Sequence, residues 1–264
     1  MASQTEIMTV PKFVALKKSG RKIVMLTAYD YTTAAIVDAA GVDGILVGDS
    51  LGMVVQGHPT TLPVTMRQML YHVEMVGRAV SRALLVADMP FLSYQLGTKQ
   101  AIRNAGLFLK RTRCQAVKLE QGPQQAEVTR ALVGAGIPVM AHFGLRPQSI
   151  HQLGGYRVVR EGEQLIEEAL AAQEAGAFAV LLEYVPADIA REITARLQIP
   201  TIGIGAGPHC DGQILVLHDI LGLGRVPRHA KAYANLKQVI HEAVAKFVQE
   251  VRDGVFPGPE HCFR

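Results

Sequence analysis

Residues 45–50 read ILVGDS, residues 84–90 read LLVADMP and residues 116–120 read AVKLE, so three apolar runs stop at Asp49, Asp88 and Glu120. Three further runs end in the same way, LTAYD at 26–30, VMAH at 139–142 and VLLE at 180–183. Short apolar runs bounded by turn signals predict strands buried on both faces, as in parallel sheets. In a (β/α)8 barrel the active site lies at the C-terminal ends of the strands, so we predict this fold with its polar strand ends around one pocket.

Length and composition favour one large α/β domain. The chain has 264 residues, of which 49% are hydrophobic and 19% charged. We expect a single barrel domain over residues 1–264, with a short N-terminal extension and a C-terminal helix. The first 22 residues show no signal-peptide pattern, and no apolar run approaches membrane-spanning length. Three cysteines without CxxC spacing argue against a disulfide framework, so we expect a cytoplasmic protein without a membrane partner.

The charge pattern does not favour a nucleic-acid partner. The net charge of +4 is spread along the chain, aromatic residues make up 6% and Trp is absent. Nucleic-acid binders usually combine a basic stripe with stacking aromatics. We therefore interpret the basic residues as solvated helix faces.

Helical periodicity follows each apolar run, and 19 residues separate Asp30 from Asp49, enough for one strand and its return helix. Gly41 and Gly176 stand at expected helix ends, and Pro123 and Pro186 at expected helix starts. The eighth strand stays open, because residues 211–222 fit either a strand or a short helix between Asp211 and Gly222. The predicted helices span 31–40, 64–80, 98–112, 123–134, 161–175, 186–197 and 231–252.

Two stretches are longer than simple connections, residues 51–63 after Asp49 and residues 144–162 after His142. Both follow strand ends where polar groups collect. Long loops inside a compact domain are often functional, so we expect these two to cover the substrate.

Lys118 and Glu120 stand two apart in a predicted strand, so both side chains face the same side of it. A structural ion pair inside the barrel is the alternative. Because barrel interiors favour bulky branched residues, paired charges at a strand end favour a functional site.

Asp49 and Asp88 end neighbouring predicted strands. Mg²⁺ prefers oxygen ligands and usually takes one or two carboxylates, leaving other positions for water and substrate. Each Asp could instead cap the structure that follows it. Together with Glu120 at the same rim, the pair favours a metal site.

Glu183 and His142 are the candidates for proton transfer. Partial burial of Glu183 after an apolar strand would raise its pKa and make it a better base near neutral pH. His142 more often would be a substrate contact than a base. Asp30 ends its run without an assigned chemistry and is expected to be structural.

Two motifs suggest other functions and fail in context. GDSLG at 48–52 would make Ser50 a hydrolase nucleophile, yet the chain contains no D-x-x-H to complete that enzyme. GIGAGP at 203–208 has Pro208 where a dinucleotide fingerprint needs its third glycine.

Several blocks, taken in order, resemble the ketopantoate hydroxymethyltransferase family over nearly the whole chain. The blocks are TAYDYTTA (27–34), ILVGDSLGMVVQGHPTTLPVT (45–65), VADMPFLSY (86–94), VKLE (117–120), AHFGLRPQSI (141–150), LLEYVP (181–186), IGIGAGPHCDGQILVLHD (202–219) and FPGPEHCF (256–263). The resemblance implies a barrel of the phosphoenolpyruvate mutase/isocitrate lyase-like superfamily. It also implies Mg²⁺-dependent transfer of a hydroxymethyl group from 5,10-methylenetetrahydrofolate to 3-methyl-2-oxobutanoate, the first step of pantothenate and coenzyme A synthesis.

The same resemblance implies roles for residues of this chain. Asp49, Asp88 and Glu120 would form the metal site, Ser50 and Lys118 would contact the keto acid, and Glu183 would be the proton acceptor. Asp49, Asp88 and His142 are further expected substrate contacts. Members of the family form homo-oligomers, often decamers.

Two other classes of function remain as alternatives. A Mg²⁺-dependent C–C or P–C lyase of the phosphoenolpyruvate mutase/isocitrate lyase type would also place carboxylates around Mg²⁺, although its reactive-Cys loop is not evident here. A catalytically silent binding protein would not need three carboxylates, Lys118 and Glu183 together.

Overall fold

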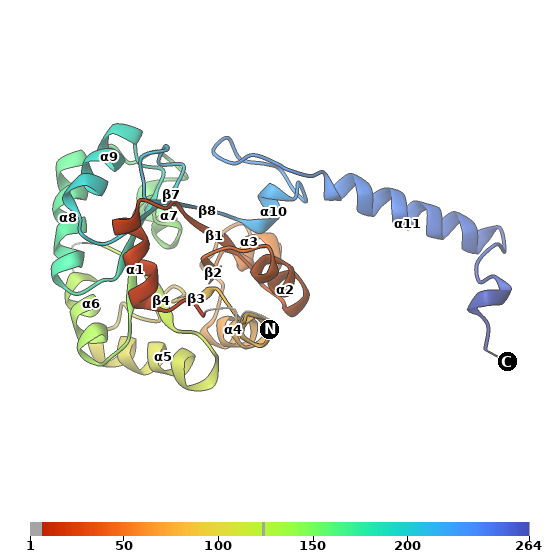
Figure 1. The fold of residues 1–264 in the computed structure, drawn as a ribbon, viewed down its shortest axis with the longest axis horizontal. Helices are drawn as coiled ribbons and strands as arrows, with labels where there is room; N and C mark the ends of the chain where they lie inside the picture. Colours follow the sequence, from red (N-terminus) through yellow and green to blue (C-terminus); the bar gives the residue numbers. More distant parts are fainter. Residues whose placement is uncertain (1–6, 123–124, 264) are drawn as a thin grey trace. The chain divides into compact units, whose positions relative to one another are not determined.

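Eight parallel strands close into a barrel in sequence order, with β8 hydrogen-bonded to β1 (Figure 1). This confirms the (β/α)8 prediction. The strands are β1 (Ile23–Thr27), β2 (Gly44–Val47), β3 (Leu84–Asp88), β4 (Ala116–Glu120), β5 (Val139–Gly144), β6 (Ala179–Glu183), β7 (Thr201–Ile204) and β8 (Gly212–Leu215).

The computed structural model describes residues 7–122 and 125–263. The chain divides into two compact units, Met1–Leu215 and Val216–Arg264, and the first contains the whole barrel. That residues 1–264 form a single domain stays a prediction.

Six long helices alternate with the strands, and Figure 1 shows them around the outside of the barrel. Six of the seven predicted helices are confirmed to within one or two residues at their described ends, while positions 123 and 124 lie outside the described residues. The start of α4 is sharp because Thr65 and Gln68 form a capping box. The six are α2 (Tyr31–Ala39), α4 (Met66–Ala79), α5 (Thr98–Arg111), α6 (Gln125–Gly134), α8 (Gly162–Glu174) and α9 (Ala187–Arg196).

A helix that the sequence analysis did not predict, α1 (Val10–Ser19), precedes the barrel. Thr9 caps its start, and Gly20 ends it in the left-handed conformation at φ 70°. Its Phe13 is fully buried and packs against Phe178, with ring centroids 5.9 Å apart. The same apolar cluster includes Ile23 of β1 and Ile214 of β8. Apolar packing of α1 therefore extends the barrel interior.

The two long connections contain short helices. After β2 comes α3 (Leu51–Val54), and after β5 come the 3-10 helix η1 (Pro147–Ser149) and α7 (Ile150–Leu153). These segments start at the C-terminal strand ends, where the candidate site lies.

Residues 211–222, for which a strand and a short helix were both possible, contain one of each: β8 and then α10 (Leu217–Ile220). Asp211 does not cap this helix, because its carboxylate accepts from the backbone N–H of Thr201 and pairs with Lys17. Gly222 has φ 64° just after the helix, as expected for a helix end.

The second unit also contains α11 (Leu236–Arg252) and η2 (Pro259–His261). The predicted helix 231–252 begins late, at Leu236, because the Asn235 side chain accepts from the backbone N–H of Gln238 and acts as N-cap. Of the helices in residues 7–122 and 125–263, none is long and apolar enough to cross a membrane.

Candidate active site

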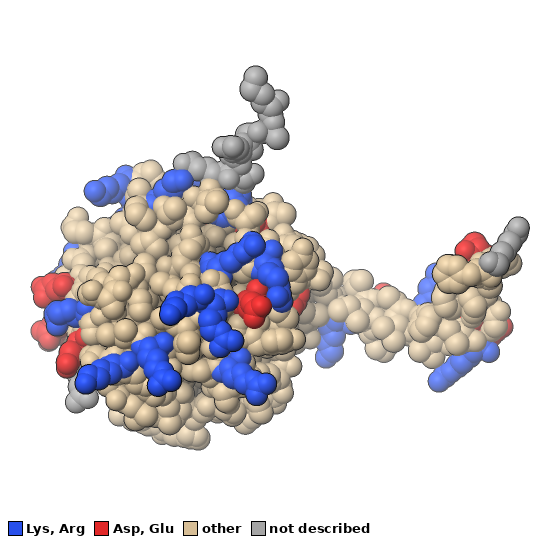
Figure 2. Space-filling model, turned by 90° about the horizontal axis from the view of Figure 1, so that it is seen from below, with Lys and Arg blue, Asp and Glu red and all other residues tan. Residues whose placement is uncertain are grey.

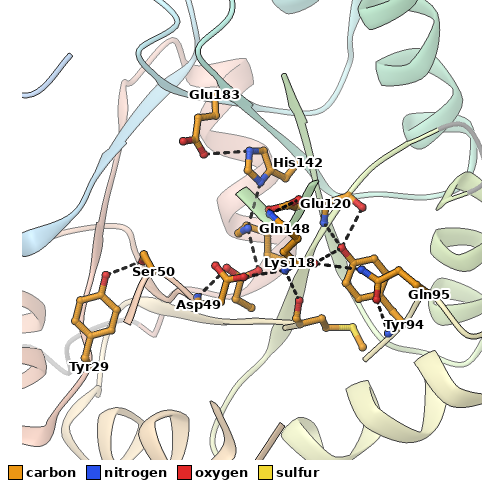
Figure 3. A network of polar contacts seen from close by, with 12 residues as sticks. Tyr29, Asp49, Ser50, Tyr94, Gln95, Lys118, Glu120, His142, Gln148 and Glu183 are labelled. Atoms are coloured by element: carbon orange, nitrogen blue, oxygen red, sulfur yellow. Dashed lines mark hydrogen bonds and ion pairs between the residues drawn. The ribbon is translucent and has the colours of Figure 1, made fainter. Parts of the chain in front are cut away.

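The six polar strand-end residues lie at the C-terminal end of the parallel barrel, and all but Asp30 form one group with Lys118. The ladder register places Asp88 beside Lys118 and Glu120 beside His142, and the end of β5 beside Glu183. Asp49 follows β2 by two residues. Figure 3 shows the side chains of Asp49, Lys118, Glu120, His142 and Glu183 turned toward one another. All are buried apart from the partly exposed Glu183.

Lys118 lies in the middle of the group. Its Nζ is 2.9 Å from Oδ1 of Asp88 and 3.3 Å from Nδ1 of His142. Burial alone would lower the pKa of Lys118, but the charges of Asp88, then Asp49 and Glu120, outweigh burial and raise it. Lys118 is therefore a buried ammonium held by carboxylates.

His142 connects this ammonium to Glu183. Its Nε2 lies 3.2 Å from Oε2 of Glu183. Because an ammonium can only donate, Nδ1 of His142 accepts from Lys118, and the ring proton lies on Nε2, facing the Glu183 carboxylate. Burial and the charge of Lys118 lower the pKa of His142, so the imidazole is neutral near pH 7.

The carboxylates of Asp49, Asp88 and Glu120 have donors on several sides. Oδ2 of Asp88 accepts from the backbone N–H of Asp49 at 3.1 Å, and Oδ2 of Asp49 accepts from Nε2 of Gln148 at 2.8 Å. Burial, followed by the charge of Asp88, raises the pKa of Asp49 to about 8. Burial, followed by the charge of Asp49, raises the pKa of Glu120. Burial and the repulsion between neighbouring carboxylates therefore favour the protonated forms of Asp49 and Glu120.

This donor set fits a divalent cation in charge and chemistry, since three buried carboxylates face a single ammonium. Among the described residues, no three His, Cys, Asp or Glu side chains are arranged so that they could hold a metal ion. Mg²⁺ usually keeps several waters and needs only one or two carboxylates. The metal role of Asp49, Asp88 and Glu120 stays a prediction.

Ser50 begins the α3 turn and is partly exposed at the barrel mouth. Its Oγ lies 2.8 Å from the hydroxyl of Tyr29, a buried residue that follows β1. Asp30, next in the chain, accepts from the backbone N–H of Thr33 and caps α2. Its expected structural role is confirmed.

Gly144 explains how β5 approaches Glu183. Its φ is 89°, and a Cβ at this position would collide with the backbone oxygen of Glu183. The backbone N–H of Leu145 donates to that same oxygen at 2.8 Å. The ends of β5 and β6 are therefore held close together, which places His142 and Glu183 in contact.

The segment after β5 reaches across toward the segment after β2. The hydroxyl of Tyr156 donates to Sδ of Met53 at 3.2 Å. Burial, followed by the charges of Glu183 and Asp49, raises the pKa of Tyr156. The contact joins the two segments expected to cover the substrate, whose covering role stays a prediction.

Tyr29, Tyr94, Gln148 and Tyr156 were not predicted from the sequence. The first three contact residues of the site, and Tyr156 joins the segments after β5 and β2. Tyr29 could have been predicted, because it stands directly before Asp30 at the end of an apolar run. Gln148 lies in a loop segment without periodicity and gave no such signal.

Exposed basic residues lie on the outer helices of the barrel unit. Figure 2 shows Lys and Arg side chains gathered on one face of the barrel unit. Exposed examples on and after α5 are Lys99, Arg103, Lys110, Arg111 and Arg113. Arg157 and Arg160, in the segment after β5, are exposed as well.

The barrel with acidic strand ends is a fold that solved structures of other enzymes share. A phosphonopyruvate hydrolase in complex with oxalate and Mg²⁺ is similar at TM-score 0.62 and 16% identity, covering 97% of this chain and 92% of that one. A 2,3-dimethylmalate lyase of the phosphoenolpyruvate mutase/isocitrate lyase superfamily is similar at TM-score 0.63 and 20% identity, with 97% and 89% covered. At such identities the similarity shows the fold alone. The chain shares its barrel fold with these two enzymes.

A family model described as ketopantoate hydroxymethyltransferase matches residues 7–259. Proteins named 3-methyl-2-oxobutanoate hydroxymethyltransferase are similar over nearly their full length. The one from Trichlorobacter lovleyi is 54% identical over 260 residues, covering 97% of this chain and 98% of the relative. The one from Pyrobaculum calidifontis is 55% identical over 258 residues, covering 96% and 97%. The chain belongs to the ketopantoate hydroxymethyltransferase family and is a transferase.

Proposed function

We propose that the chain transfers a hydroxymethyl group from 5,10-methylenetetrahydrofolate to C3 of 3-methyl-2-oxobutanoate, giving 2-dehydropantoate as the first step of pantothenate synthesis. The observation that supports it best is the Glu183–His142–Lys118 chain beside the buried carboxylates. The names of the relatives support the keto acid as substrate.

The difficult step is the removal of the C3 proton, because the enolate that forms is very basic. Glu183 is the candidate base, with 18% of its side chain exposed and thus within reach of a ligand in the barrel mouth. The Nε2–H of His142 orients the Glu183 carboxylate. Because His142 is neutral, it places no positive charge beside Glu183.

The remaining groups would bind the keto acid and offset its charge. Lys118 supplies a permanent positive charge near the substrate's oxygens, and the Ser50 hydroxyl can donate to the substrate carboxylate. Asp49, Asp88 and Glu120 would hold Mg²⁺, which when bound supplies a Lewis acid for the negative charge that develops on the keto oxygen. The C3 carbon then bonds to the methylene carbon of the folate as one of its two C–N bonds breaks. Water replaces the second nitrogen and supplies the hydroxyl oxygen, and tetrahydrofolate leaves with one proton from Glu183 and one from water.

The proposal includes two further expectations. The family resemblance favours a homo-oligomer, with a decamer as the expected size, which the mass of the purified protein in solution would test. It also favours a cytoplasmic location. The lyase alternative is supported by the fold alone, at 20% identity or less for the lyase and hydrolase structures described above.

Hydrogen exchange at C3 tests the base directly. With Mg²⁺ and 3-methyl-2-oxobutanoate in D₂O, without folate, the wild-type protein should exchange the C3 proton. Glu183→Gln should slow this exchange by about 100-fold or more, the usual range for a lost general base. Glu192→Gln, at a half-exposed carboxylate paired with Arg196 on α9, is the matched control. Undiminished exchange in Glu183→Gln would move the role of base to His142.

A further inference from the structure

We propose that Gln148 is a positioning residue, whose amide side chain holds the Asp49 carboxylate while its backbone N–H holds the Glu120 carboxylate. The inference rests on the proposed function for the role of these two carboxylates. Gln148 lies in η1, in the segment after β5, and is only 4% exposed. It therefore reaches the strand-end carboxylates from a covering segment rather than from a strand.

The orientation of the Gln148 amide follows from its partners. Oε1 accepts from the hydroxyl of Tyr94 at 2.8 Å and from Nε2 of Gln95 at 3.2 Å. Nε2 must then be the end that faces Oδ2 of Asp49 at 2.8 Å and the backbone oxygen of Met89 at 2.9 Å. A primary amide has two N–H donors and two acceptor positions on its oxygen, so all of its hydrogen-bonding capacity is used. Such a group is held in one orientation.

The backbone of the same residue holds the second carboxylate. The N–H of Gln148 lies 3.1 Å from Oε1 and 3.2 Å from Oε2 of Glu120, so it is shared between the two oxygens. Tyr94 adds to this arrangement, since its hydroxyl also accepts from the backbone N–H of Glu120 at 3.2 Å. Figure 3 shows Gln148 among Asp49, Glu120 and Tyr94.

When both are ionised, as cation binding requires, Asp49 and Glu120 repel one another in a buried site, so each needs a donor to keep its place. Lys118 supplies its ion pair to Asp88. Gln148 supplies donors to the other two carboxylates, and a single rigid residue that contacts both determines their separation. A cation that uses either carboxylate would then find it already oriented, as outer hydrogen-bond partners do at metal sites.

The test compares two buried glutamines. Gln148→Met keeps the length of the side chain and the backbone N–H but removes the amide. Gln121→Met is the matched control, because Gln121 is equally buried at 2% exposure and its amide donates to Thr129 rather than to a carboxylate. For each protein we would measure Mn²⁺ affinity by the electron paramagnetic resonance of free Mn²⁺ without substrate, C3 exchange in D₂O, and the melting temperature.

Gln148→Met should weaken Mn²⁺ binding and slow C3 exchange by about 10- to 100-fold, the usual cost of losing an outer partner at a metal site. Gln121→Met should lower the melting temperature without changing Mn²⁺ affinity. Equal Mn²⁺ affinities and exchange rates in the two variants would overturn the proposal and make Gln148 merely structural.

If Gln148→Met fails to fold, Tyr94→Phe serves as a second variant for the same test. It removes one of the two donors that fix the Gln148 amide. Mn²⁺ binding should then weaken by several-fold, and unchanged affinity would overturn the proposal. The Mn²⁺ comparison does not depend on the reaction, so a wild-type protein that bound Mn²⁺ but neither exchanged C3 nor formed product would contradict the proposed function alone.

Discussion

Nε2 of His142 lies 3.2 Å from Oε2 of Glu183, while the opposite ring nitrogen faces the ammonium of Lys118 at 3.3 Å. The neutral imidazole therefore ties the candidate base to the strand that carries Lys118. The imidazole contacts Glu183 without placing a positive charge beside it.

Replacing His142 should slow proton removal through its effect on Glu183. In His142→Phe the carboxylate loses its hydrogen-bond donor, and we expect C3 exchange in D₂O to fall by about 10- to 100-fold. His142→Gln can place an N–H near the position of Nε2 and should recover part of the rate. An exchange rate in His142→Phe equal to the wild type would show that Glu183 needs no such partner.

The contact between Tyr29 and Ser50 predicts a coupled effect on keto-acid binding. Ser50→Ala should raise KM for the keto acid by about tenfold, the value of one hydrogen bond to a charged group. Tyr29→Phe removes only the hydroxyl that lies 2.8 Å from Ser50 Oγ and should have a smaller effect in the same direction. Because Tyr29 acts through Ser50, the double variant should bind no worse than Ser50→Ala. Fully additive losses in KM would contradict this dependence.

The strands and most of the site could be predicted because buried parallel strands are continuous apolar runs, and their polar last residues are visible in the sequence. Alternation along β4 placed Lys118 and Glu120 on one side, where both are now buried at 4% exposure. The ladder register explains why Asp88 meets Lys118, since the two are directly paired.

Other features depend on contacts that no local pattern encodes. Gln148 is a loop residue whose role follows only from the packing of η1 against β4. Helix α1 buries just one residue, Phe13, so its apolar periodicity is weak. Residues 211–222 were ambiguous because the strand is four residues long and a helix follows after a single residue.

Asp38 on α2 predicts a pH-dependent stability unrelated to catalysis. Its buried carboxylate accepts from Ser81 N at 2.9 Å and from Ala83 N at 2.8 Å, just before β3. Burial tends to raise its pKa, but the hydrogen bonds from Ser81, Ala83 and Arg82 together outweigh burial and lower it below 3.8. Asp38→Asn turns an N–H group toward these donors and should cost about 3 kcal/mol at pH 7.

The sign of the pH dependence follows from this lowered pKa. The unfolded chain binds the proton more readily, so the stabilisation by Asp38 is complete above pH 3.8 and is lost as the pH falls through the folded-state pKa. Urea unfolding should therefore show a wild-type advantage that shrinks below about pH 4. Asp188→Asn, an exposed carboxylate in the first turn of α9, should change stability by about 0.5 kcal/mol or less. An advantage that persisted unchanged at low pH would contradict this account.

Asp49 predicts the opposite dependence, and one that a cation should remove. Burial and the charge of Asp88 raise its pKa to about 8, so between pH 3.8 and about 8 the folded protein holds a proton that the unfolded chain has released. Without a divalent cation, this residue makes stability fall as the pH rises, by at most about 1.4 kcal/mol per pH unit.

Mg²⁺ that uses the Asp49 carboxylate must displace that proton, so its stabilising effect should be larger at about pH 8 than at about pH 6. Urea unfolding at both pH values, with EDTA or with millimolar Mg²⁺, measures the difference. Asp49→Asn should remove most of the Mg²⁺ effect, together with the fall in stability between the two pH values. Equal stabilisation by Mg²⁺ at both pH values, unchanged in Asp49→Asn, would mean that the cation binds elsewhere.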